Sequence, residues 1–251
     1  MIRFLPVEWH DELPSTNTHL IERVKSDADT PSGAVVAARM QTAGRGRQAR
    51  RWNTAPGQNL TFSFLWNAPV PPAYLPSMAQ AISVGIARFL ERQGVPPAIK
   101  WPNDVLAGGK KIAGILCERA GDAWIAGIGL NVNMTAEAAA AIDQPATSLA
   151  IETGRAHRVD EVLERLLGEL QAPLAAWATG GFAAICDAYA ALSLSRGAAI
   201  RVRDGEHHVE GTLLGFSAHG GLRLGLPDGS ERLLYSGDVH PAGRVDGRGE
   251  A

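Results

Sequence analysis

The chain has 251 residues, of which 45% are hydrophobic and 20% are charged, and its formal net charge is −2. These values are ordinary for a globular protein with a buried core, built as one large domain or as a large and a small one. The slightly acidic balance excludes a general nucleic-acid-binding protein. The N-terminus lacks a signal pattern and no apolar run approaches membrane-spanning length, so we expect no membrane association.

Cysteine and histidine usage predicts no metal centre. The two cysteines, Cys117 and Cys186, lie far apart, in neither a metal nor a redox spacing. We expect both to be buried, reduced thiols, which is typical of a cytoplasmic protein. The seven histidines fall in no ligand spacing, and His207 and His208 are expected on the surface of a polar turn.

Two strands and a helix are expected near the N-terminus. Residues 3–9 are compatible with a short strand, and a helix then opens near Ser15 and Thr16, either of which can cap it. Residues 33–38 are apolar throughout, which predicts a buried strand. The small polar side chains of residues 15–17 have two interpretations of equal weight. They cap the helix, or they offer hydroxyl and amide groups to a polar ligand.

Four further strands and a long helix are expected between residues 59 and 133. Residues 59–66 alternate between large apolar and small polar side chains, which predicts a half-buried strand. Residues 75–93 have the apolar spacing of a helix. A strand over 98–101 ends at a proline, and residues 110–118 and 123–133 form a hairpin-like pair. Together these strands predict a central, mixed β-sheet.

Helices are expected to dominate the following segment. Residues 135–154 are rich in alanine and predict short helices, and residues 182–192 predict a further one. Residues 159–178 predict an amphipathic helix with a kink or break at Pro173.

The composition changes after residue 198 to short β-rich runs separated by glycine turns. The expected strands are residues 199–203, 209–215, 221–226 and 231–235. They predict a small antiparallel barrel that is separable from the rest of the chain. We therefore expect a main domain over 1–194, a C-terminal barrel over 195–241 and a disordered tail over 242–251.

An arginine-rich loop, defined as residues 41–52, follows the apolar strand at 33–38. Four of its twelve residues are arginine, two are glycine, and it closes on Trp52. Glycine lets backbone N–H groups turn toward an anion, and guanidinium groups match phosphate or carboxylate. Because the chain as a whole is not basic, this concentration of arginine favours anion binding over an ordinary solvated loop.

The loop is also compatible with two other functions. Gly44, Gly46 and Ala49 satisfy the relaxed fingerprint of a dinucleotide turn, but such a turn must open a helix, and residues 50–57 predict a loop. Arginine and glycine beside an aromatic ring would also suit single-stranded nucleic acid, although the acidic balance elsewhere favours this less. The chain contains no Walker A motif, so any nucleotide is held in another way.

Five motifs, in this order, resemble those of biotin–protein ligases. They are Ser15-Thr16-Asn17, Gly-Arg-Gly-Arg-x-x-Arg-x-Trp at 44–52, Lys-Trp-Pro-Asn-Asp at 100–104, Lys-Ile-Ala-Gly-Ile-Leu-x-Glu at 111–118, and Gly-Ile-Gly-Leu-Asn-Val-Asn at 127–133. The resemblance implies an α+β fold, in which a central mixed sheet flanked by helices, as in class II synthetases, precedes a small SH3-like β-barrel. The related lipoate ligases lack the arginine-rich motif.

The resemblance implies a two-step reaction. Biotin and MgATP give biotinyl-5′-AMP and pyrophosphate, and the biotin then passes to one lysine of a biotin carboxyl carrier domain, as in acetyl-CoA carboxylase. The residues suit this chemistry, because a carboxylate and an α-phosphate must meet and the charge that develops at phosphorus must be stabilised. A flexible loop can also order over the labile adenylate and exclude water. The alternatives are another carboxylate-activating ligase, of the lipoate type, or a non-catalytic anion-binding module.

The site residues that the resemblance implies fall into three groups. The catalytic cations are Lys111, Arg45 and Arg47. The biotin-binding residues are Ser15, Thr16, Asn17, Gln41, Gly44, Arg45, Gly46, Arg47, Lys111 and Gly114. The ATP-binding residues are Arg50, Trp52, Asn103, Asp104, Lys111 and Asn131. The protein itself is expected to supply no metal site, and Mg²⁺ is expected to arrive with ATP.

The other motif residues are expected to be structural or solvated. Trp101 and Trp124 are expected in the core, and Lys100 and Lys110 in solvent. Gly127 and Gly129 are expected to allow tight strand packing, and Asn133 is expected in a turn. Because the motifs begin close to residue 11, we expect a short form of the ligase, without the N-terminal DNA-binding domain of some family members. The family resemblance also allows a homodimer through the edge of the central sheet.

Overall fold

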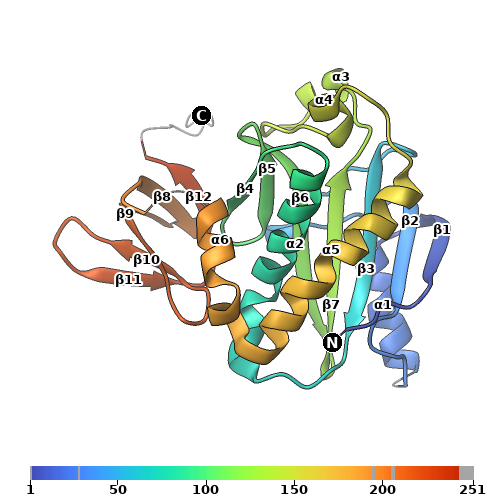
Figure 1. The fold of residues 1–251 in the computed structure, drawn as a ribbon, viewed down its shortest axis with the longest axis horizontal. Coiled ribbons are helices and arrows are strands. Elements are labelled where there is room, and N and C mark those ends of the chain that lie inside the picture. The colour runs from blue at the N-terminus through green and yellow to red at the C-terminus, as the bar shows by residue number, and fades with distance from the viewer. Residues whose placement is uncertain (1, 28, 194–195, 205–206, 243–251) are drawn as a thin grey trace.

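The computed structural model describes residues 2–27, 29–193, 196–204 and 207–242. Within these residues, a seven-stranded sheet lies beside a five-stranded sheet (Figure 1). The strands of the first sheet are β1 (Val7–Leu13), β2 (Val35–Gln41), β3 (Asn59–Trp66), β4 (Pro97–Lys100), β5 (Asp104–Ala107), β6 (Lys110–Ala120) and β7 (Ala123–Asn131). The strands of the second are β8 (Ala199–Asp204), β9 (His207–Phe216), β10 (Leu222–Gly225), β11 (Glu231–Leu234) and β12 (Asp238–Pro241). The α-helices are α1 (Thr16–Ser26), α2 (Met78–Arg92), α3 (Ala136–Ala140), α4 (Leu149–Thr153), α5 (Val159–Gly180) and α6 (Cys186–Leu192).

The first sheet is mixed. Its strand order is β1-β2-β3-β7-β6-β5-β4, in which β1 and β2 pair in parallel and every other neighbouring pair is antiparallel. The long strands β3, β7 and β6 form its centre, with Phe62 of β3 opposite Ile128 of β7. Helix α1 packs on one face and helices α2 and α5 on the other, so the predicted central mixed sheet flanked by helices is confirmed.

Strand β3 is buried on both faces, which corrects the prediction of a half-buried strand. Leu65 packs with Leu20 of α1 on one face of the sheet. Phe62 and Phe64 point to the opposite face, into the core that α2 and α5 cover. The small polar residues of β3 also lie inside, because their hydroxyl groups have partners: Thr61 donates to the carbonyl of Ala38 at 2.9 Å.

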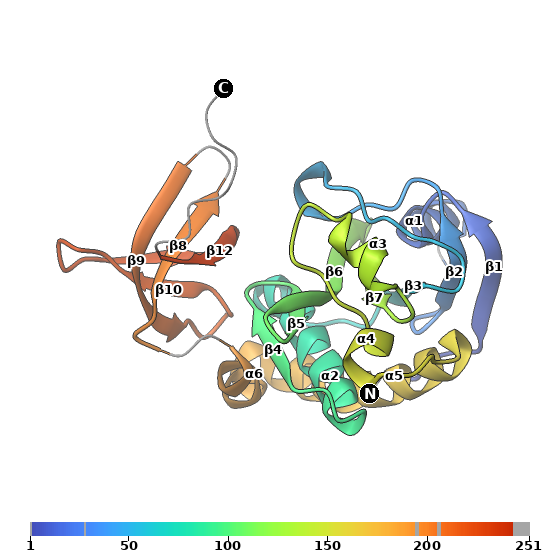
Figure 2. The ribbon, with the colours of Figure 1, turned by 90° about the horizontal axis from the view of Figure 1, so that it is seen from above.

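The second sheet is antiparallel, with the order β11-β10-β9-β8-β12, and is consistent with a small barrel-like domain. Figure 2 shows it next to α6 and the β4 edge of the first sheet. The side chains of Gln80 and Trp101 both donate to the carbonyl of Gly220, at 2.9 and 3.0 Å. Leu213 and Leu224 belong to the same core cluster as the helices, so one core runs through both sheets. Strand β12 was not predicted, and in the first sheet neither was β5.

Several element boundaries differ from the predictions, and three of the differences have a clear physical reason. Strand β1 runs from Val7 to Leu13 rather than over 3–9, because its pairing with β2 sets its length. Helix α5 continues through Pro173, whose cost is offset by the burial of its neighbours against α2. The helix expected over 182–192 begins only at Cys186, because Gly181 has a left-handed φ of 62° and a 3₁₀ turn follows it.

Several predictions concern the chain ends and single residues. Residues 243–251 of the expected tail lie outside the described residues, as do residues 194 and 195 at the expected domain boundary. His207 and His208 are exposed, as predicted, but on β9 rather than in a turn. Cys117 and Cys186 are free and partly buried, and burial raises the pKa of Cys117 to about 12. None of the helices in the described ranges has the length and apolarity needed to cross a bilayer.

Candidate active site

A cleft of about 900 Å³, including its open mouth, lies over the central strands of the first sheet. Its wall is formed by the first turn of α1, the arginine-rich loop, the turn between β4 and β5, and the start of β12. Both sheets therefore contribute to one cavity.

The floor of the cleft is bare backbone of β6 and β7. Gly114 pairs with Gly129 across these strands, and Gly127 lies two residues along β7 on the same face. A Cβ atom on Gly127 would lie 2.2 Å from Oδ1 of Asn17, and one on Gly129 would lie 2.2 Å from the ring of Trp52. These two glycines make room for cleft side chains, which corrects the expectation that they serve strand packing alone.

Trp52 lies on this floor at the end of the arginine-rich loop. Its ring is 3.3 Å from the position that a Cβ atom of Gly114 would take, and Nζ of Lys111 is 5.8 Å from the ring centroid. Its indole N–H is buried and has no hydrogen-bond partner among the described residues. A buried donor without an acceptor is costly, so this N–H is available to an acceptor on a ligand.

Lys111 and Asp104 form an ion pair inside the cleft. Their Nζ and Oδ1 atoms are 2.8 Å apart, and the two side chains are 16% and 12% exposed. The backbone of Lys111 is held on both sides, since its N–H donates to Pro145 and its carbonyl accepts from Thr147. The amide of Asn131 donates to the carbonyl of Thr147 at 2.9 Å and so supports this segment from below. The lysine is therefore fixed in position by buried contacts.

The arginine-rich loop folds back on itself above the floor. The N–H of Gly46 donates to the carbonyl of Arg50, and the N–H of Trp52 donates to the carbonyl of Gly44. Between them is a short 3₁₀ turn in which Gln48 has a left-handed φ of 55°. No helix opens here, so the geometry does not match a dinucleotide turn.

Three of the loop arginines are held by acceptors from different parts of the fold. Arg45 donates to Oε2 of Glu118 at 3.1 Å, Arg47 to Oδ1 of Asn103 at 2.9 Å, and Arg50 to Oδ2 of Asp238 at 2.7 Å. Each contact joins the loop to a different strand or turn. The guanidinium groups thus surround the cleft in a defined arrangement, as an anion-binding site requires.

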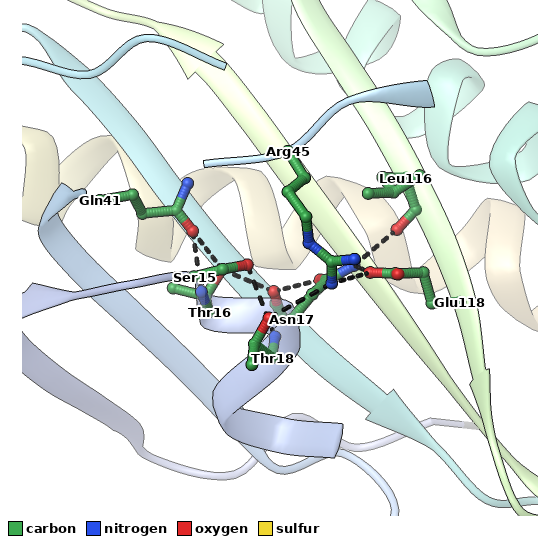
Figure 3. Close-up of polar contacts among 9 residues, drawn as sticks. Ser15, Thr16, Asn17, Thr18, Gln41, Arg45, Leu116 and Glu118 are labelled. Atoms are coloured by element: carbon green, nitrogen blue, oxygen red, sulfur yellow. Dashed lines mark hydrogen bonds and ion pairs between the residues drawn. The ribbon is translucent and has the colours of Figure 1, made fainter. Parts of the chain in front are cut away.

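The first turn of α1 supplies a polar cluster at one end of the cleft (Figure 3). Oε1 of Gln41 accepts from the backbone N–H of Thr16 at 2.8 Å and from its hydroxyl at 3.1 Å. The hydroxyl of Ser63 donates to Oδ1 of Asn17 at 2.6 Å and lies 2.7 Å from the hydroxyl of Thr16. Ser15 caps the helix, which confirms the capping interpretation. Residues 15–17 also line the cleft, and their role toward a polar ligand stays a prediction.

Asp238 of β12 connects the second sheet to the cleft. Its carboxylate is 2.7 Å from Nζ of Lys100 and 2.7 Å from Nη2 of Arg50. Burial raises the pKa of Asp238, but the charges and hydrogen bonds of Lys100 and Arg50 outweigh burial and hold it well below its ordinary value. The expectation that Lys100 is solvated was wrong, because its side chain is 23% exposed and ion-paired. Lys110 is exposed, as expected.

The structure brings together almost all of the predicted site residues. The exceptions are Gly44 and Asn131, which are buried and do not line the cleft. Sequence reasoning missed Ser63, Glu118 and Asp238. Glu118 ends one of the family-like motifs and Ser63 is a small polar residue in an apolar strand, so both carried a signal. Asp238 carried no local signal, because its partners are far away in the sequence.

The structure also gathers Glu8, His10 and His19 at the outer edge of the first sheet, which the histidine spacing did not indicate. Their nitrogen and oxygen atoms lie within 4.8 Å of one another. Nε2 of His10 is 2.9 Å from one oxygen of Glu8, and Nη1 of Arg23 is 2.6 Å from the other. Both carboxylate oxygens are therefore in use, and hydrogen bonding alone accounts for this arrangement.

Comparison with known proteins shows which family the chain resembles. The model of the Biotin/lipoate A/B protein ligase family matches residues 9–134. The biotin–[acetyl-CoA-carboxylase] ligase of Mycobacterium tuberculosis is 36% identical over 234 residues, which cover 90% of this chain and 85% of that protein. The bifunctional ligase/repressor BirA of Bacillus subtilis is 31% identical over 238 residues, covering 92% of this chain and 72% of that protein.

A solved structure extends the likeness to both sheets. The biotin protein ligase from Aquifex aeolicus, in complex with biotin and ATP, superposes with a TM-score of 0.79 and 30% identity, covering 94% of this chain and 98% of that one. The family match, the sequence identity and the common fold agree with one another. The chain therefore belongs to the Biotin/lipoate A/B protein ligase family, as a ligase of its biotin–protein ligase branch.

Proposed function

We propose that the protein activates biotin with ATP, giving biotinyl-5′-AMP and pyrophosphate, and then transfers the biotin to a lysine of a biotin carboxyl carrier domain. The observation that carries this proposal is the convergence of Lys111 and the arginine-rich loop on one cleft with a bare glycine floor. The name of the Mycobacterium relative and the ligands of the Aquifex structure support the choice of substrates.

The cations of the cleft account for the first step. A carboxylate oxygen of biotin attacks the α-phosphorus of ATP, an acyl–phosphate bond forms, and the bond to pyrophosphate breaks. Both reactants are anions, so their repulsion must be neutralised. Lys111 is suited to this because its ammonium is mostly buried, where a fixed charge acts more strongly than in water. Arg45 and Arg47 come from the loop above it.

The polar cluster and Trp52 account for binding. The side chains of Thr16, Asn17 and Gln41 present donors and acceptors, which match the N–H and C=O groups of a cyclic urea such as the ureido ring of biotin. Trp52, with its unpaired N–H and a flat ring on the glycine floor, is suited to the nucleotide. The two substrates would then meet between these ends, beside Lys111.

The Mg²⁺ expected with ATP is part of the nucleotide substrate. Among the described residues that line the cleft, Asp104 and Asp238 supply the carboxylates, and both are already ion-paired. Such a donor set suits an ion that keeps phosphate and water ligands rather than one held in a protein cage. When bound, Mg²⁺ would neutralise phosphate charge.

The second step needs the loop to open for a macromolecular acceptor. The amine of the carrier lysine attacks the acyl carbon of the adenylate, an amide bond forms, and AMP leaves. The arginine-rich loop is joined to the rest of the fold by side-chain contacts, which can break and re-form as it moves. We also propose that the carrier domain belongs to acetyl-CoA carboxylase, that the enzyme is cytoplasmic, and that it forms a homodimer through the edge of the first sheet.

Incubation with labelled biotin, ATP and a carrier domain tests the function. A ligase labels the carrier, a mere activator only catalyses biotin-dependent pyrophosphate exchange, and an anion-binding module does neither. Parallel reactions with lipoate in place of biotin distinguish a lipoate-type ligase. Labelling with lipoate but not with biotin would overturn the proposal.

A further inference from the structure

We infer that Glu118 is a positioning residue that fixes both the amide of Asn17 and the guanidinium of Arg45, and so couples one end of the cleft to the arginine-rich loop. Glu118 lies outside the residues that line the cleft, whereas Asn17 and Arg45 both line it. The part of this inference that concerns biotin rests on the proposed function.

One carboxylate oxygen of Glu118 makes both contacts (Figure 3). Oε2 accepts from Nδ2 of Asn17 at 2.7 Å and from Nη2 of Arg45 at 3.1 Å. The side chain of Glu118 is 23% exposed, which shields this anion from water more than a typical surface carboxylate. Hydrogen bonds to an ionised acceptor are stronger than those between neutral groups.

The contact with Asn17 decides which end of that amide faces the ligand side. Nδ2 of Asn17 has two hydrogens, and these go to the carbonyl of Leu116 at 3.1 Å and to Glu118. Oδ1 is then turned toward Ser63 and the glycine floor at Gly127. Asn17 is thereby held as an acceptor toward the cleft, which is the orientation that receives an N–H group of a bound ligand.

The contact with Arg45 holds the loop. Nη2 of Arg45 donates to Glu118 and, at 3.2 Å, to the hydroxyl of Thr18 in α1. Arg45 is 46% exposed, so it has little packing to keep it in place without these acceptors. Loss of the carboxylate should therefore free the first arginine of the loop and the amide of Asn17 together.

Two substitutions separate the two contacts. Glu118→Ala removes both contacts. We expect it to raise KM for biotin by about tenfold and the rate of biotinyl-AMP release by about tenfold. KM for ATP should change by less than about twofold. Glu118→Gln keeps a neutral acceptor in place, so KM for biotin should change little while adenylate release still rises. Glu169→Gln is the matched control, because Glu169 is 21% exposed and pairs with Arg92 away from the cleft.

A double-mutant cycle with Arg45→Ala tests the coupling. If Glu118 acts on the adenylate through Arg45, then Glu118→Ala should add little to adenylate release in the Arg45→Ala background. Additive effects would overturn the inference. So would a Glu118→Ala variant that matches Glu169→Gln, or one in which KM for biotin and KM for ATP rise together, as a general loosening of the cleft would produce.

Limited digestion with trypsin tests the loop contact without any assumption about substrate. In the ligand-free protein, cleavage within the arginine-rich loop should be several-fold faster in both Glu118 variants than in wild type, and unchanged in Glu169→Gln. Unaltered cleavage overturns the inference even if the wild-type protein is an active ligase. Faster cleavage in a protein without biotin-dependent pyrophosphate exchange would instead retain the contact and reject the proposed function.

Discussion

Arg50 of the arginine-rich loop and Asp238 of β12 form an ion pair, in which Nη2 and Oδ2 lie 2.7 Å apart. The same carboxylate binds Lys100 at 2.7 Å, and the neighbouring carbonyl of Gly237 accepts from Arg47. The second sheet is therefore part of the wall of the cleft. Its effect on the ligase reaction should be measurable through single side chains.

Asp238→Asn should destabilise the protein, because it leaves Lys100 and Arg50 without their counter-charge. We expect a loss of about 2 kcal/mol at neutral pH, measured by urea denaturation. The low pKa of Asp238 in the folded state means that its contribution is present above the ordinary aspartate pKa of about 4 and is lost as the pH falls below it. The difference between wild type and variant should therefore shrink in acid.

Glu231→Gln is a control for the same sheet. Glu231 pairs with Arg223, and both side chains are about 40% exposed, so its substitution should change stability little at any pH. If the difference in unfolding free energy between wild type and Asp238→Asn grows in acid, the assigned ion pair is contradicted.

Lys111→Ala should slow adenylate formation most, by roughly 10²-fold or more, because a fixed cation at the reacting phosphate is lost. Biotin-dependent pyrophosphate exchange measures this step, and transfer from preformed biotinyl-AMP measures the second. Lys110→Ala, at the exposed neighbouring position, should leave both steps unchanged. An effect of Lys111→Ala confined to transfer would show that its role is misassigned.

Arg47→Ala should leave the fold intact but release biotinyl-AMP faster or weaken biotin binding, by about tenfold. Arg47 joins the loop to Asn103 at 2.9 Å, so its loss frees the loop above the intermediate. Arg39→Ala is the control, because Arg39 is 56% exposed and lies outside the residues that line the cleft. Equal adenylate retention by the two variants would argue against a sealing role for Arg47.

Gly129→Ala should displace Trp52, because the added Cβ would lie 2.2 Å from its ring. We expect a loss of about 1–3 kcal/mol in stability and a higher KM for ATP. Gly168→Ala in α5 should instead raise stability, by about 0.5–1 kcal/mol, because no atom lies within 4 Å of the position of the added Cβ. Thermal unfolding and steady-state kinetics of both variants test this pair.

The sequence predicted those parts of the site that lie within single short segments. The arginine-rich loop, the turn before Asp104 and the capping residues near Ser15 each carry their signal locally, and the structure places them around one cleft. The mixed sheet followed from runs of apolar residues in the same way. Their roles toward biotin and ATP stay predictions until ligands are tested.

Other features depend on contacts between distant residues and were missed. The alternation in β3 predicts a solvent-facing side, but Ser63 is buried because α1 brings Asn17 to it. Lys100 resembles an ordinary surface lysine until Asp238, far along the chain, is placed beside it. Residues 127 and 129 look like packing glycines because their partners, Asn17 and Trp52, come from other elements.

The bare backbone beneath the cleft also limits how the enzyme can diversify. Where Gly114, Gly127 and Gly129 meet, the sheet offers no side chain to exchange, and any larger residue would collide with the cleft side chains that rest on this backbone. New selectivity would therefore have to arise from the surrounding rim, by changes in α1 or in the loop. Laboratory evolution toward biotin analogues should accumulate its mutations there and spare these three positions.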